Sequence, residues 1–162
     1  GIFACLKQLD INPIPVDAIL YCDGPGSILG IRTVAMAIRA WNVLSPRATY
    51  SYRSLELVSA AIARPEASII ADARRERWHC QQIGQPIQQL PAAELTGELL
   101  IPEGFRHWSV LPENTATTSY DLEQLTSRAS EAPLFTATDH PDAYLHAEPS
   151  YKQWPPQIHR TP

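Results

Sequence analysis

The most regular pattern in the chain is a short apolar run followed, after a glycine-rich turn, by apolar residues at helical spacing. Residues 16–22 form the apolar run, which is typical of a parallel strand buried on both faces. From residue 29 to 44 apolar positions recur every three or four residues, which predicts an amphipathic helix capped by Ser27. The expected buried stripe of this helix contains Ile31, Val34, Ala35, Ile38 and Trp41.

Similar patterns on both sides extend this unit. Residues 1–9 carry helical spacing from the first position, so we expect the chain to begin inside a helix that ends before Pro13. Residues 48–52 are typical of a strand, and residues 55–63 of a helix capped by Ser54. The resulting order of helix, strand, helix, strand and helix predicts an α/β fold built on a parallel sheet.

The second half of the chain predicts shorter elements. A boundary near Arg64 divides an N-terminal lobe, residues 1–63, from a C-terminal lobe, residues 64–162. Asp121 with Gln124 indicates a capping box that opens a helix over 122–130. Polar, proline-rich sequence predicts irregular structure at 84–91 and an extended C-terminal tail. The expected strands are 67–72, 77–83, 98–101 and 107–111.

Composition narrows the range of functions. The chain has 162 residues, with 44% hydrophobic and 19% charged positions and a net charge of −4. Its Lys and Arg residues are spread out, which argues against direct nucleic-acid binding. No apolar run is long enough to span a membrane, and residues 1–9 do not resemble a secretory leader. The three cysteines, Cys5, Cys22 and Cys80, are widely spaced, so we expect a cytoplasmic protein with reduced thiols.

The glycine turn is the first candidate for chemistry. Gly24, Gly26 and Gly30 follow a strand and open a helix, where free backbone amides could hold a phosphate. The turn lacks the Gly-Lys-Ser/Thr ending of a Walker loop, and its spacing differs from that of dinucleotide-binding loops. Nucleotide binding therefore stays a minor alternative to a structural connection between strand and helix.

The second candidate is a charged turn between two predicted strands. Asp72 is followed by Arg74 and Arg75, which predicts a solvated hairpin with a local ion pair. The alternative is a charged contact point for a partner. Neither HExxH nor HxxxH occurs among the five histidines, and no serine stands in a GxSxG elbow. Cys80 and its neighbour His79 would point to opposite faces of a strand, so they do not form a catalytic pair. We therefore expect no catalytic residue, no bound metal and no cofactor.

Two of these segments together resemble the TsaB (YeaZ) family, the non-catalytic dimerisation subunit of the bacterial threonylcarbamoyladenosine machinery, which is related to the M22 glycoproteases. The family signature GPGSFTGLR is similar to residues 24–32, and its DARRGEVY-like hairpin is similar to residues 72–79. A Pro-x-Tyr sequence near the family's C-terminus matches residues 149–151. The resemblance covers residues 1–82 and the tail, and the chain departs from it at Ile28, Leu29, Glu76 and His79.

The resemblance implies an actin/Hsp70-like, ribonuclease H-like fold of two lobes, here without the family's first strands. It also implies a scaffold that supports threonylcarbamoylation of adenosine 37 in tRNA by pairing with a TsaD-type catalytic subunit. The implied signature residues are Gly24, Pro25, Gly26, Ser27, Gly30 and Arg32, and the implied hairpin residues are Asp72, Arg74 and Arg75. The absence of HxxxH, which the catalytic subunit carries, favours the scaffold role.

The family pairs through its first two helices, either with TsaD or with a second copy of itself, and a TsaE-type ATPase is a further candidate partner. Carried onto this chain, the implied interface residues are Phe3, Leu6, Ala35, Met36, Arg39 and Ala40. On this basis Ala35→Arg or Ala40→Arg should abolish pairing and leave the fold intact. The competing functions are a glycoprotease-like hydrolase and a module that binds phosphate or a nucleotide at the glycine turn.

Overall fold

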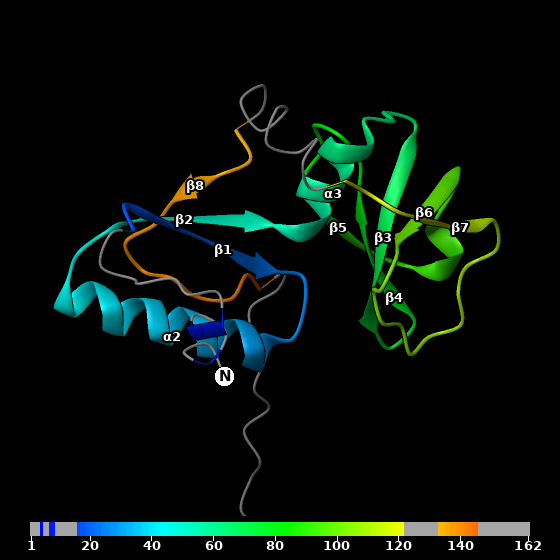
Figure 1. Ribbon diagram of the computed structural model, residues 1–162. Coiled ribbons are helices and arrows are strands. Elements are labelled where there is room, and N and C mark those ends of the chain that lie inside the picture. Colours follow the sequence, from blue (N-terminus) through cyan, green and yellow to red (C-terminus); the bar gives the residue numbers. More distant parts are fainter. Residues whose placement is uncertain (1–3, 5–6, 9–15, 122–132, 146–162) are drawn as a thin grey trace, which may run out of the picture.

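The computed structural model describes residues 4, 7–8, 16–121 and 133–145, which form two β-sheets with the helices α2 and α3 (Figure 1). The first sheet has the strand order β1-β2-β8, and the second has the order β5-β4-β3-β6-β7. The elements are β1 (Ala18–Gly24), α2 (Ile28–Leu44), β2 (Ala48–Arg53), α3 (Ser54–Ile62), β3 (Ala67–Arg74), β4 (Arg77–Gln81), β5 (Gln88–Pro91), a 3₁₀ turn (Ala92–Glu94), β6 (Glu98–Pro102), β7 (Thr115–Thr118) and β8 (Thr136–Ala137).

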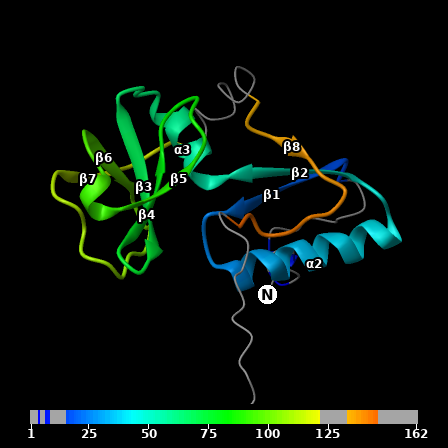
Figure 2. The ribbon, with the colours of Figure 1, turned by 180° about the vertical axis from the view of Figure 1, so that it is seen from behind.

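The first sheet confirms the predicted strand–turn–helix unit. β1 and β2 are parallel, and α2 lies along one face of the sheet (Figures 1 and 2). Ala35 and Ile38 are buried there, as the periodicity predicts. The prediction that β1 is buried on both faces is wrong, because Leu20 remains 50% exposed on the face opposite α2.

The ends of the two helices show one correct and one wrong capping prediction. Ser27 caps α2, and its side-chain oxygen accepts the backbone N–H of Gly30 at 3.3 Å. Ser54 does not cap α3; it is the first helical residue, and Arg53 holds the cap position. Its hydroxyl instead donates toward the carbonyls of Gly24 and Pro25, because the glycine turn lies beside it.

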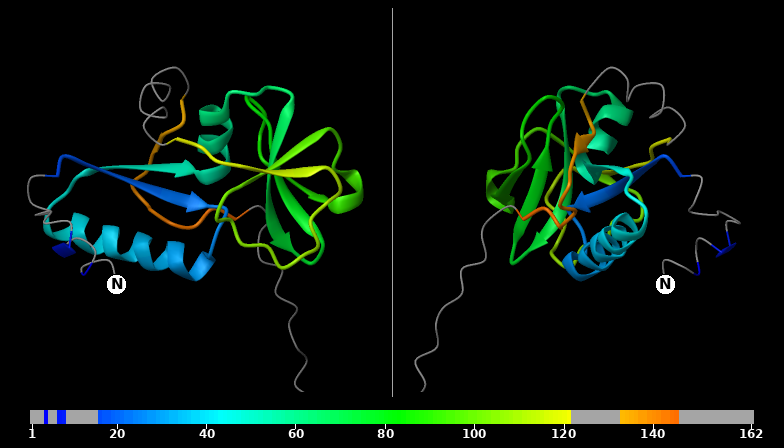
Figure 3. Two further views of the ribbon diagram at one scale, coloured as in Figure 1. Left: turned by 45° about the vertical axis from the view of Figure 1, so that its right-hand side comes forward. Right: turned by 90° about the vertical axis from the view of Figure 1, so that its left-hand side faces the viewer.

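The second sheet is built around β3, whose first five residues are buried. β3 is antiparallel to β4 and parallel to β6. On one face Leu55 and Val58 of α3 pack against Ile69. On the other, Ile70 packs with the fully buried Trp78. Because α3 also contacts β1 and β2, it lies between the two sheets, as the side views show (Figure 3).

Several predictions for the second sheet need correction. Residues 107–111, expected as a strand, are irregular, and the outer strand is β7 instead. The segment 84–91, expected to be irregular, contributes β5. Strand β4 ends at Gln81 rather than residue 83. A turn follows β6, in which the N–H of Phe105 donates to the carbonyl of Pro102 at 3.1 Å.

The chain returns to the first sheet through residues 133–145. β8 pairs with β2, and the N–H of Tyr144 donates to the carbonyl of Asp23 at 2.8 Å. The boundary predicted near residue 64 stays a prediction, although β8 belongs to the sheet of β1 and β2. The predicted helix 122–130 and the tail from 146 lie outside the described residues. Within the described part, no helix is both long and apolar enough to cross a membrane.

Candidate functional site

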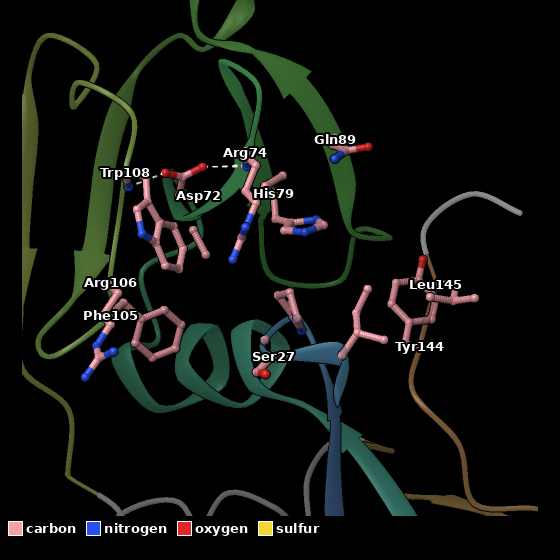
Figure 4. Close-up of a pocket in the computed structure, with 15 residues that line it drawn as sticks. Ser27, Asp72, Arg74, His79, Gln89, Phe105, Arg106, Trp108, Tyr144 and Leu145 are labelled. Carbon is pink, nitrogen blue, oxygen red and sulfur yellow. Dashed lines mark hydrogen bonds between the residues drawn. The ribbon is translucent and has the colours of Figure 1, made fainter. Parts of the chain in front are cut away.

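A cleft of about 740 Å³ opens where the glycine turn after β1 faces the β3–β4 hairpin (Figure 4). The two segments that resemble family motifs are separated by about forty residues in sequence, and the fold brings them onto this one cleft. A pocket of this size is typical of small-molecule or peptide binding. The lining residues are Pro25, Gly26, Ser27, Ile28, Ala71, Asp72, Ala73, Arg74, His79, Gln89, Phe105, Arg106, Trp108, Tyr144 and Leu145.

The glycine turn forms one wall of the cleft, and only one of its glycines has a backbone that requires glycine. Gly24 has φ +140° and precedes a cis peptide bond to Pro25. A Cβ on Gly26 would meet the side chain of Ile31 at 3.5 Å, an ordinary contact. A Cβ on Gly30 would likewise lie 3.5 Å from Ser27. Of the three glycines in this turn, only Gly24 therefore has a backbone conformation that disfavours other residues.

The signature arginine, Arg32, does not face the cleft's ligand space but anchors the returning chain. Its Nε lies 3.4 Å from a carboxylate oxygen of Asp142, and Arg39 lies 3.9 Å from the other oxygen. The hydrogen bond from the N–H of Ala143 lowers the pKa of the Asp142 carboxyl most; burial opposes this shift, and the charges of Arg32 and Arg39 add to it. Tyr21 and the backbone of Asp142 also exchange hydrogen bonds, at 3.1 and 3.2 Å.

The β3–β4 hairpin forms the opposite wall and turns without a glycine. Arg75 and Glu76 have φ +53° and +59°, the left-handed values that a two-residue hairpin turn of type I′ requires. Arg74 is also left-handed, with φ +66°, and a register shift lies between Asp72 and Arg74. The hairpin therefore forms even though Glu76 stands where the family has glycine.

Asp72 organises this wall through backbone hydrogen bonds rather than through the expected local ion pair. Its carboxylate accepts the N–H groups of Arg74 at 2.5 Å, Trp108 at 2.6 Å and Ser109 at 2.8 Å, and the Ser109 hydroxyl at 3.3 Å. Partial burial alone would raise the pKa of the Asp72 carboxyl, but these hydrogen bonds outweigh burial and lower it. The carboxylate thus fixes residues 107–111 in a loop and prevents the strand that the sequence predicts.

Two arginines, Arg74 in the cleft and Arg53 beside it, lie against aromatic rings that line the cleft. The guanidinium of Arg74 sits 4.5 Å from the centre of the Trp108 ring and points into the cleft (Figure 4). At the far edge, Arg53 lies 3.9 Å above the Tyr144 ring and is paired with Glu56 at 3.2 Å. Asp23, beside Gly24, is half-buried, and burial raises the pKa of its carboxyl although Arg53 opposes the shift.

The implied interface residues on α2 divide between its two faces. Ala35 is only 2% exposed and packs toward the sheet, so its assignment to an exposed interface is wrong. Met36 is 60% exposed, and Ala40 is exposed as well. Arg39 is partly buried beside Asp142. Phe3 and Leu6 lie outside the described residues.

The outer face of α2 carries a row of exposed apolar residues, which we call the α2 stripe. It consists of Leu29, Met36, Ala40 and Val43, at spacings of seven, four and three residues that align them on one helix face. Leu29 is 79% exposed and Val43 83%. The helix is thus apolar on two opposite faces, of which the sheet covers one.

Two further groups of reactive side chains in the described residues are the thiols and the candidate metal ligands. Burial raises the pKa of the Cys22 thiol and of the Cys80 thiol, and neither forms a disulfide. Residues 16–121 and 133–145 contain no cluster of three His, Cys, Asp or Glu side chains suited to a metal ion.

Sequence reasoning missed much of the cleft. Phe105, Arg106, Trp108 and Tyr144 were not predicted as site residues, because loop or tail positions give no periodic signal. The available signal was local: the aromatic residues Phe105 and Trp108 stand on either side of the basic pair Arg106 and His107. Only the contact with Asp72, 36 residues earlier in sequence, places this segment at the cleft.

The fold of this chain is similar to that of two solved structures. The chain resembles YeaZ from Pseudomonas aeruginosa at a TM-score of 0.58 and 16% identity, over 89% of this chain and 80% of that one. It also resembles an uncharacterized protein with similarity to peptidase YEAZ from Pseudomonas aeruginosa at a TM-score of 0.53 and 17% identity, over 80% and 72%. No family model and no curated protein matches the chain. The expected α/β fold of actin/Hsp70 type is confirmed.

Proposed function

We propose that the chain is a non-catalytic, TsaB-type partner subunit that pairs through α2 with a TsaD-type catalytic subunit and so supports threonylcarbamoylation of adenosine 37 in tRNA. The observation that carries this proposal is the exposed α2 stripe. The YeaZ-like fold supports it, as do the signature and hairpin segments that meet at one cleft.

The stripe has the chemistry of a helix-pairing surface. Met36 and Val43 are large apolar side chains left in water, and burying each against a partner would stabilise a complex by about 1.5–3 kcal/mol. Ala40 lies between them and allows a second helix to approach closely. Such a cluster of exposed apolar residues on one helix face is typical of an interaction surface rather than of scattered surface residues.

The scaffold role is favoured over a catalytic one by the residues themselves. The catalytic subunit of the family carries an HxxxH metal motif, and the sequence of this chain contains none. Its two described thiols have raised pKa values, which keeps them protonated and poorly nucleophilic at neutral pH. The chemistry would then reside in the partner, and this chain would contribute the helix that binds and orders it.

A pull-down with the TsaD-type subunit of the same organism tests the proposal, followed by size-exclusion chromatography with light scattering. We expect the wild-type chain to form a heterodimer that Met36→Arg and Val43→Arg abolish. Ile83→Arg is the matched control, because Ile83 is 39% exposed in the turn after β4, outside both α2 and the cleft lining. Failure of the wild type to bind, or undiminished binding by both α2 variants, would refute the proposal. A homodimer that does not bind the TsaD-type subunit, and that Met36→Arg and Val43→Arg abolish, would refute the proposed partner. It would still support the α2 stripe as an interaction surface.

A further inference from the structure

The cleft lining has an excess of positive charge, because it contains two arginines and a single acid. Arg32, Arg39, Arg53 and Arg64 each pair with a carboxylate. By contrast, no described carboxylate pairs with the guanidinium groups of Arg74 and Arg106, both of which line the cleft. This local excess is notable in a protein whose net charge is −4.

The single acid in the lining does not compensate these arginines. Asp72 uses both carboxylate oxygens to hold the backbone of Arg74, Trp108 and Ser109. Unpaired guanidinium groups beside apolar walls attract carboxylates, because each presents a planar set of donors. The cleft therefore offers two free cationic sites against a largely apolar surface.

Exposed apolar side chains continue this surface beyond the cleft. Trp108 and Val110 lie exposed in the loop that Asp72 fixes, and Arg75 is exposed at the tip of the hairpin. A ligand that used all these groups would extend from the cleft onto its rim, which an extended peptide can do and a small ion cannot. Trp and Arg are also the residues most often found at the energetic centres of protein interfaces.

The surface is held in place before any ligand arrives. The Asp72 carboxylate accepts three hydrogen bonds from the loop and one from the Arg74 N–H, and Arg74 packs over the Trp108 ring. A preorganised surface loses less conformational entropy on binding. The loop therefore loses its conformational entropy when the protein folds, and not when a ligand binds.

From this arrangement we propose that the cleft is a docking site for an acidic, extended peptide segment of a partner, in which carboxylates reach Arg74 and Arg106 and an apolar side chain packs beside Trp108. Charge complementarity with the two unpaired arginines selects this occupant. The site uses the hairpin and the loop 105–111, whereas the α2 stripe runs along the outer face of α2. The proposals for the cleft and for the α2 stripe can therefore be tested independently of each other.

Fluorescence anisotropy of a labelled peptide of alternating Glu and Leu, titrated with the full chain, tests the docking site. We expect binding that weakens with added salt and falls about tenfold or more in Arg74→Gln, since a hydrogen bond to a charged group is lost. Trp108→Ala should weaken binding as well. Arg64→Gln is the matched control: it removes the same charge from the opposite end of β3 and should bind within about twofold of wild type.

Other results would overturn the proposal. A peptide with Lys in place of Glu should not bind, and equal binding of both peptides would indicate a nonspecific apolar surface. Complete displacement of the Glu–Leu peptide by millimolar inorganic phosphate would indicate a small-anion site instead. Binding unchanged in both Arg74→Gln and Trp108→Ala, with circular dichroism showing both variants folded, would place the peptide elsewhere.

Discussion

Asp72→Asn tests whether a single carboxylate fixes the cleft loop. Each carboxylate oxygen accepts two hydrogen bonds: Oδ1 from Arg74 N–H and the Ser109 hydroxyl, Oδ2 from the N–H groups of Trp108 and Ser109. Asparagine keeps one acceptor oxygen and places an NH₂ group where the other oxygen stood, so it loses two of the four bonds. Hydrogen bonds to charged groups contribute about 1.5–3 kcal/mol each when buried. Because water reaches Asp72, we expect the substitution to lower the free energy of unfolding by about 1–2 kcal/mol.

The pH dependence of that loss gives a second, independent check. Hydrogen bonding lowers the pKa of Asp72 in the folded protein below its unfolded value of about 3.9. The stabilisation is therefore complete above about pH 5 and disappears as the pH falls through the folded-state pKa. Asparagine does not titrate, so the difference between wild type and variant should shrink in acid.

Urea unfolding at neutral and acid pH measures both quantities. Glu66→Gln provides a control that removes one exposed carboxylate, whose distance of 3.9 Å from Arg64 predicts a change below about 0.5 kcal/mol. A loss in Asp72→Asn no larger than in this control would refute the account of the loop. So would a loss of equal size at neutral pH and in acid.

Two further predictions concern α2 and the glycine turn. Ala35→Arg should unfold the protein or destabilise it by at least about 3 kcal/mol, because Ala35 is 2% exposed and the new charge would be buried without a partner. The measurement is thermal unfolding of this variant beside Met36→Arg, whose new charge faces water. Equal melting temperatures of the two variants would contradict the prediction. Gly24→Ala should cost about 1–3 kcal/mol because φ is +140° there, whereas Gly26→Ala should be nearly neutral; comparable urea midpoints for the two variants would show that Gly24 carries no backbone requirement.

The strand–turn–helix unit was predictable because its signals are local. Apolar spacing predicts α2, and the capping residue Ser27 accepts a hydrogen bond from the N–H of Gly30, only three residues later in the sequence. The missed strands β5 and β7 have the sequences QQLP and TATT, which lack an alternating apolar pattern. These two segments become strands because they pair with the neighbouring strands β4 and β6, and not because of their own composition.

The cleft was less predictable because its contacts join distant segments. Asp72 and Arg74 were correctly chosen as candidates, but the partners of Asp72 lie at residues 108 and 109. A strand was predicted at 107–111 from composition alone, and the carboxylate overrides that propensity. Likewise, the sequence identifies Ala35 and Met36 as neighbours on one helix, and only the position of the sheet decides which of them faces water.

The return of residues 133–145 to the first sheet has a consequence for the order in which the protein is completed. Tyr21 bonds with Asp142, 121 residues later, and β2 receives β8 from the same distant segment. The second sheet is encoded entirely between these partners. During synthesis its strands all leave the ribosome before β8 does, so the second sheet can form before β8 is available to pair with β2.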